Sequence, residues 1–297
     1  MNRFFFTALW CLLSLQLTAQ EQEDGTISTQ AYDFESWTRE WFEPLKEAVV
    51  FADACKLRVN PSSGSEMLSK LLIGDRVQVL KVLDADTTIN GIKSRWIQVE
   101  SGKKKGYVWG GLLTNQVLKI SDTTAAVWGI SRIEPGNDTV PDKYYASIRI
   151  FSRRQVRKQV EFEVTHGDQP GFGELTMIQH PLLDEVEHVF VYHTLSEACG
   201  VAWSDHYLLE TGDQIRYLDV GSGVGEAGLF HSSDRLVFPT KETEQDYSIP
   251  YNRKPEKNQI LKISAHDEFD ENCIWTEHTT VEAFEWKAGE LVPFCRE

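Results

Sequence analysis

Apolar and polar residues alternate along most of the chain, which is the period of a β-strand with one buried face. In the first third, Cys55, Leu57 and Val59 share one face of such a strand. Turn signals such as Gly74-Asp75 divide this region into short strands, and about five of them within roughly 65 residues suit a small barrel. We therefore predict a small β-barrel over residues 49–114.

From residue 115 onward the pattern stays β-like, with short apolar strands separated by turn residues. It predicts a larger antiparallel domain, a sheet or a sandwich, over residues 115–297, and makes the whole chain mainly β. Residues 207–213 and 285–291 each combine an aromatic strand, a glycine turn and an apolar return, as a hairpin does. The clearest strand candidates are residues 125–130, 144–151, 156–164, 188–192, 214–218, 235–238, 260–264 and 281–286.

The first residues read as a targeting segment. Arg3 precedes an almost uncharged apolar run over residues 4–17, and Ala19 offers a small residue for cleavage. This pattern predicts a signal peptide over residues 1–19, with an uncleaved anchor as the alternative. We expect a secreted or periplasmic protein without a membrane span after cleavage, since no later stretch reaches about 18 apolar residues.

A polar leader and one short helix are expected over residues 20–48. Phe34, Trp37 and Trp41 recur on one face of a helical projection, and Pro44 ends the pattern. The spacing favours an aromatic stripe that packs on a neighbouring domain.

Four landmarks of a known module occur in order between residues 49 and 114. They are Leu57-Arg58-Val59-Asn60-Pro61-Ser62, Gly74-Asp75-Arg76-Val77, Trp96-Ile97-Gln98-Val99 and Gly106-Tyr107-Val108-Trp109. The region resembles the bacterial SH3-like (SH3b) family, whose pattern runs from a Leu-x-x-x-Pro-Ser opening to a Gly-Tyr-Val strand. A longer insertion, residues 84–94, departs from that pattern. The region after the barrel resembles uncharacterised exported β-rich domains of Bacteroidetes-type bacteria, which implies no activity.

The resemblance implies a binding role, because SH3-like barrels hold peptides in shallow grooves edged by aromatics. Trp96, Tyr107 and Trp109 would then supply stacking area, with Arg58 available to pair with a peptide carboxylate and Asn60 nearby. Each aromatic could instead belong to the barrel core, so both assignments stay open. Peptidoglycan or a peptide is the expected partner.

Charge is unevenly distributed. The chain carries −15 in total, whereas residues 49–114 hold ten Lys and Arg against six Asp and Glu. Nucleic acid is not an expected partner, because its phosphates demand a basic footprint. Lys103, Lys104 and Lys105, at a predicted hairpin tip, are either a solvated turn or a contact for anionic wall polymer.

Four cysteines follow the predicted signal peptide. Export permits disulfides, and we expect Cys273 to pair with Cys295, with all four unpaired as the alternative. Cys55 shares the parity of Leu57, so it is expected to be a buried thiol in the barrel.

Enzyme motifs are incomplete. Residues 218–226 look like a methyltransferase glycine motif, but the following segment does not read as a helix, so a glycine-rich turn is expected. No cysteine has the setting of an NlpC-type peptidase nucleophile. The histidines lack zinc spacings, and His188 and His193 are expected on opposite strand faces. Residues 267–272 lack the glycine of a calcium loop. No cofactor or metal is expected.

Three functions stay open. The first is an exported, non-catalytic binding protein that uses the barrel. The second is a hydrolase with a site in the C-terminal domain, for instance Asp205, His206 and Glu210, which requires these groups to converge in a pocket. The third is a structural subunit or scaffold in which the barrel packs on the rest of its own chain.

Overall fold

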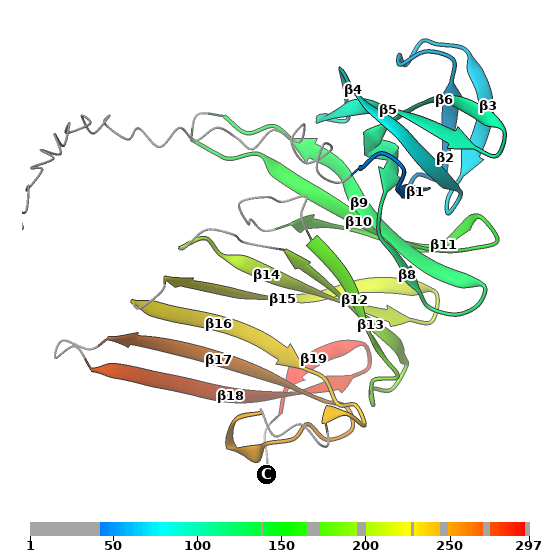
Figure 1. Cartoon of the computed structure of the whole chain (residues 1–297). Helices are drawn as coiled ribbons and strands as arrows, with labels where there is room; N and C mark the ends of the chain where they lie inside the picture. The colour runs from blue at the N-terminus through cyan, green and yellow to red at the C-terminus, as the bar shows by residue number, and fades with distance from the viewer. Residues whose placement is uncertain are drawn as a thin grey trace, which may run out of the picture. The chain divides into compact units, whose positions relative to one another are not determined.

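Strands dominate the molecule. The computed structural model describes residues 42–137, 139–164, 173–194, 200–226, 229–243, 249–269 and 274–294. Within these ranges the strands form three antiparallel sheets, and η1 (Gly110–Leu112) and η3 (Pro250–Asn252) are single helical turns (Figure 1). The predicted fold class, mainly β with a small barrel before larger antiparallel sheets, is confirmed. No helix in the described ranges is long and apolar enough to cross a membrane.

Some expectations concern residues outside these ranges. They are the signal peptide, the short helix with Phe34, Trp37 and Trp41, and the Cys273–Cys295 disulfide.

The first sheet, which forms the barrel, has the strand order β3-β2-β6-β5-β4-β1-β7. Its core takes alternate residues of each strand, among them Leu57, Ile97 and Val108, as the period of two requires. Cys55 lies in this core, and burial, followed by the charge of Asp75, raises its thiol pKa to about 12. The predicted buried thiol is confirmed. The strands are β1 (Glu47–Val50), β2 (Ala54–Arg58), β3 (Met67–Leu72), β4 (Arg76–Ile89), β5 (Ile92–Ser101), β6 (Lys104–Trp109) and β7 (Leu113–Thr114).

The insertion at residues 84–94 lengthens β4 and β5 into an extended hairpin. Its turn is Asn90-Gly91, with φ of 54° and 79°, as a two-residue type I′ turn requires. The tip contacts the next sheet, because the Ile133 N–H donates to the carbonyl of Asn90 at 3.1 Å. Ile92, only 2% exposed, packs into the core shared with that sheet. The departure from the family pattern thus attaches the barrel to the rest of the chain.

The second sheet has the order β11-β10-β9-β8. Its strand β9 is covered on both faces: Trp128 packs toward the third sheet, whereas Val127 packs on Phe51 and Ile73 of the barrel. Burial on both sides explains why β9 reads as an unbroken apolar run rather than as an alternation. The strands are β8 (Val117–Lys119), β9 (Thr124–Glu134), β10 (Lys143–Ser152) and β11 (Gln155–Val164).

The third sheet is a meander in which each strand pairs with the next along the chain, from β12 to β19. Both predicted hairpins are present, with Gly212 in the turn between β14 and β15 and Gly289 in the turn between β18 and β19. The strands are β12 (Gly173–Gln179), β13 (Val186–Thr194), β14 (Trp203–Thr211), β15 (Gln214–Glu226), β16 (Phe230–Val237), β17 (Gln259–Phe269), β18 (Trp275–Lys287) and β19 (Glu290–Pro293).

The glycine-rich segment 218–226 lies within β15, paired with β14 and β16, so the expected turn is wrong. A methyltransferase motif needs a strand that ends in glycines before a helix, and this segment is continuous strand. Gly223 lies opposite Trp203, and a Cβ there would come within 2.2 Å of the indole ring. This glycine leaves room for a tryptophan.

We predict that Gly91→Ala destabilises the protein more than Gly102→Ala. Both glycines have positive φ, which costs an alanine about 1–2 kcal/mol. At Gly91 the new Cβ would also lie 2.2 Å from the Ile133 carbonyl oxygen, whereas nothing lies within 4 Å at Gly102. Urea unfolding measures both free energies, and equal losses would contradict the docking role of the Asn90-Gly91 turn.

Candidate ligand-binding surface and polar clusters

Trp96 and Trp109 form a cross-strand pair on the outer face of the barrel. Their neighbours Ile97 and Val108 point into the barrel core, so the two indoles point away from it. They are nevertheless only 2% and 4% exposed, because the shared core with Trp128 covers them. These two predicted site residues are therefore neither barrel core nor an open groove, but join the barrel to the second sheet.

The extended hairpin satisfies both buried indole N–H groups. Trp96 donates to the Thr87 hydroxyl at 2.9 Å, and Trp109 donates to the carbonyls of Thr87 and Ser94 at 2.9 and 3.1 Å. Buried indoles need such partners, so the insertion serves the tryptophans chemically as well as sterically.

The rest of the outer face is partly accessible, and Tyr107, which also packs against the shared core, is half-buried. A row of directly paired residues crosses five strands: Met67, Arg58, Tyr107, Gln98 and Lys81. None of the five is buried, and Met67 is 48% exposed. The structure thus brings Arg58 and Tyr107 together, as direct neighbours on β2 and β6.

Hydrogen bonds order the hairpin that carries Arg58 and Asn60. The Arg58 guanidinium donates to the Ser65 carbonyl at 2.6 Å, and the Asn60 N–H donates to the Ser65 hydroxyl at 2.8 Å. The Lys104 ammonium donates to the carbonyl of Leu68 at 3.0 Å. Three exposed apolar side chains, an arginine and a lysine therefore share one edge of the barrel; the apolar ones are Val59, Met67 and Leu68.

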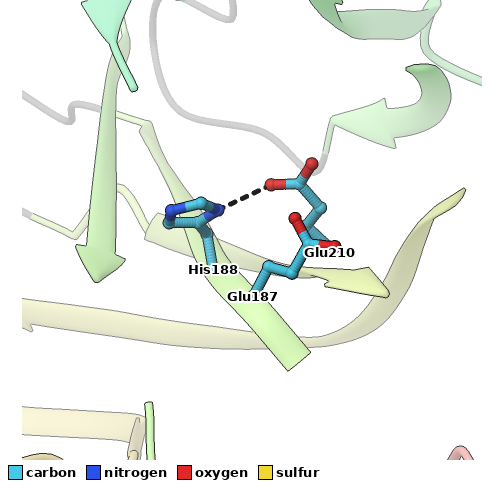
Figure 2. A group of neighbouring side chains, drawn as sticks. All are labelled: Glu187, His188 and Glu210. Atoms are coloured by element: carbon cyan, nitrogen blue, oxygen red, sulfur yellow. Dashed lines mark hydrogen bonds and ion pairs between the residues drawn. The ribbon is translucent and has the colours of Figure 1, made fainter. Parts of the chain in front are cut away.

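A second group of polar residues lies in the third sheet. The pairing of β13 with β14 passes from Val186 to His188, so Glu187 is an extra residue in a β-bulge. A bulge re-aims side chains, and here both Glu187 and His188 reach Glu210 (Figure 2). His188 Nδ1 lies 2.7 Å from Glu210 Oε2. Strand alternation places Glu187 and His188 on opposite faces, so sequence reasoning missed this cluster.

Lys158 of β11 brings a positive charge from the second sheet to the cluster. Its Nζ lies 2.5 Å from Glu210 Oε1 and 3.9 Å from Glu187 Oε2. Burial raises the pKa of Glu210, but hydrogen bonds from His188 and Lys158 outweigh it and hold the pKa below its ordinary value. Glu210 is therefore a buried carboxylate at the junction of two sheets.

Residues 53–114 match the family model of the bacterial SH3 domain. The chain contains a bacterial SH3 domain. The match covers the barrel strands from β2 to β7, without β1, and includes both Arg58 and Tyr107. Comparisons with curated proteins and with solved structures gave no match.

The hydrolase constellation is not assembled in the sheets that follow the SH3 domain. On β14, Asp205 points to the face opposite His206 and bonds His193 Nδ1 at 2.5 Å. His206 and Glu210 share a face but are four residues apart, about 13 Å along a strand. The three groups therefore do not converge in one pocket, as the hydrolase hypothesis required.

His206 belongs instead to a buried polar chain. It is 0% exposed and lies 3.1 Å from both the Ser204 hydroxyl and the Tyr217 hydroxyl. Burial lowers the pKa of His206 to about 4. The ring is thus held neutral among aromatic neighbours, of which Phe162 and Tyr192 are two.

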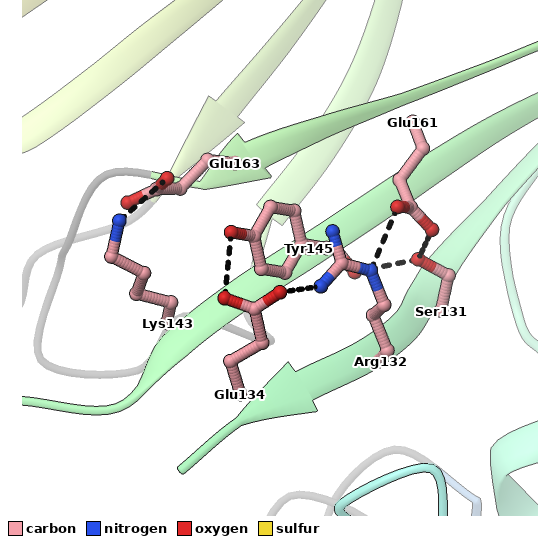
Figure 3. A network of polar contacts seen from close by, with 7 residues as sticks. All are labelled: Ser131, Arg132, Glu134, Lys143, Tyr145, Glu161 and Glu163. Carbon is pink, nitrogen blue, oxygen red and sulfur yellow. Dashed lines mark hydrogen bonds and ion pairs between the residues drawn. The ribbon is translucent and has the colours of Figure 1, made fainter. Parts of the chain in front are cut away.

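A further polar network covers one face of the second sheet (Figure 3). Here too the pairing of β9 with β10 skips one residue, Ser131. Glu161 is 2.6 Å from the Ser131 hydroxyl and 2.9 Å from Arg132 Nε, and the Arg132 guanidinium lies over the Tyr145 ring. Glu134 also accepts a hydrogen bond from Arg132, and this bond holds the pKa of the Glu134 carboxyl below its usual value. These contacts cross-link three strands, and exposed ion pairs of this kind contribute little individually.

We predict that His206 makes stability depend on pH. Its pKa is about 4 in the folded chain, against the ordinary histidine value of 6.5 that applies once the chain unfolds. As pH falls from 6.5 to about 4, only the unfolded state gains a proton, which costs up to about 3 kcal/mol of stability. Urea unfolding at several pH values should show a steeper acid loss for the wild type than for His206→Gln. Parallel profiles would contradict a neutral, buried His206.

Proposed function

We propose that this chain is an exported, non-catalytic binding protein whose SH3 domain holds a peptide or cell-wall fragment. The observation that carries the proposal is the accessible row on the outer face of the domain, with Arg58 and Tyr107 paired at its centre. Bacterial SH3 domains commonly bind peptidoglycan or peptides.

The chemistry of this row suits a peptide with a free carboxylate. Arg58 offers charge-assisted hydrogen bonds, Tyr107 a flat ring with a polar end, and Met67 an adaptable apolar contact. Lysines enlarge the positive field, since Lys56 and Lys70 are paired on the same outer surface and Lys104 lies at its edge. An anionic wall fragment would be attracted before it makes specific contacts.

The covered tryptophans limit what this surface can do. Trp96 and Trp109 are used in attaching the domain to the second sheet, so stacking falls to Tyr107 alone among the three predicted aromatics. We infer a shallow site of modest affinity, adjacent to a rigid support. Export rests on the signal-peptide pattern of the first residues.

The scaffold reading is the second candidate, and the burial of Trp96 and Trp109 by the same chain favours it. A scaffold needs the SH3 domain only as a packed unit, with its outer face serving as an internal interface. The two readings differ at Arg58, which a scaffold does not need for any ligand.

We predict that the full chain co-sediments with purified peptidoglycan at low salt. Arg58→Glu and Lys104→Glu should each weaken retention several-fold, because each places a negative charge on the proposed surface. Arg157→Glu is the matched control: it makes the same charge change at an exposed position of β11.

The outcomes separate the readings. If peptidoglycan does not retain the wild-type protein, the wall-binding proposal is wrong and the scaffold hypothesis is favoured. Equal losses for all three variants would mean attraction by net charge alone. If sediment binding is specific, competition with soluble wall peptides against peptide-free glycan strands distinguishes the two parts of the polymer.

A further inference from the structure

We propose that Glu187, His188 and Glu210 form a binding site for a divalent transition-metal ion of the Zn²⁺ type, in competition with the ammonium group of Lys158. The site lies in the third sheet and goes beyond the peptide-binding function proposed for the SH3 domain.

Geometry supplies the first argument. One ligand atom from each residue lies within 4.8 Å of the others, and two ligands of one tetrahedral ion are about 3.5 Å apart. His188 and Glu210 are held in place, with side chains 16% and 5% exposed, whereas Glu187 is 54% exposed and can move. Rotation of Glu187 would close the set (Figure 2).

The donor atoms indicate the class of ion. An imidazole nitrogen with carboxylate oxygens suits Zn²⁺ and its neighbours, whereas Ca²⁺ and Mg²⁺ prefer oxygen alone. Binding through Nδ1 of His188 replaces its hydrogen bond to Glu210 and leaves the ring proton on Nε2. Three protein ligands leave one position for water or another small ligand.

Lys158 supplies an independent argument, because its ammonium group already forms ion pairs with both carboxylates. Its ammonium lies 2.5 Å from Glu210 and 3.9 Å from Glu187. A lysine is a point charge on a flexible stem, so it can leave when a doubly charged ion arrives. Zinc affinity is therefore set by competition, and removing the lysine charge should raise it.

An open pocket lies beside the bulge residue Glu187, and neither His188 nor Glu210 lines it. Its volume is about 520 Å³, and Glu187 is among its lining residues, together with Thr211 and Arg216.

The same two strands offer a matched control. His193 on β13 and Asp205 on β14 are also a paired histidine and carboxylate, with Nδ1 2.5 Å from Oδ1. No third ligand group joins that pair within the described residues. A site that depends on the bulge residue Glu187 should therefore exist at the first pair and be missing at the second.

We predict saturable binding of one Zn²⁺ per chain, measured by calorimetry on the full chain near pH 7. Glu210→Gln and His188→Ala should abolish it. Lys158→Gln should tighten it by roughly tenfold, because it removes a positive charge beside the ion. Asp205→Asn should leave it unchanged, and thermal unfolding of each variant checks that it is folded.

Cobalt tests the ligand type, because thiolate ligands add an intense charge-transfer band that nitrogen and oxygen ligands lack. The proposal expects a Co²⁺ spectrum without that band. It is overturned if neither the wild type nor Lys158→Gln binds zinc, if Lys158→Gln binds no tighter, or if Asp205→Asn loses as much as Glu210→Gln. These measurements use no peptidoglycan, so their failure leaves the proposed function of the SH3 domain untouched.

Discussion

The core that joins the barrel to the second sheet decides which part of the barrel's outer face is buried and which part remains exposed. Trp96 and Trp109 from the barrel meet Trp128 in one continuous apolar cluster, which extends to Tyr192 of the third sheet. Burying aromatics of this size is among the strongest stabilising contributions a fold contains. It also removes two tryptophans from the barrel surface, so the proposed binding surface consists of the row around Arg58.

β-bulges explain where the polar clusters lie. An extra residue in β13 brings Glu187 and His188 to the same carboxylate, and an extra residue in β9 accompanies the network around Arg132. Each bulge breaks strict alternation, so neighbours in sequence can serve one site. Lys158 of β11 forms an ion pair with Glu210 of β14. The cluster around Glu210 therefore also connects the second sheet to the third.

Sequence patterns gave correct predictions where the alternation within a single strand determined which way a side chain points. Alternation placed Cys55 in the barrel core and His188 and His193 on opposite faces of one strand, and glycine turns marked hairpins. The patterns gave wrong predictions where contacts with a distant segment of the chain determined the local structure. Residues 218–226 have the glycines of a turn, yet Trp203 on the neighbouring strand needs that space within a strand. Asp205, His206 and Glu210 are close in sequence but separated by strand geometry.

The sequence by itself determined the barrel, the mainly β class and the inward or outward parity of most strand residues, because these follow from local periodicity and turn chemistry. Only the tertiary structure decided which outward faces remain accessible. Parity shows that Trp96 points away from Ile97, but not that Trp96 is buried in a core shared with the second sheet. Likewise, nothing local shows that Glu187 occupies a bulge. The burial of an outward-facing side chain and the register of paired strands both depend on contacts between segments far apart in the chain. A local sequence pattern contains no information about such contacts.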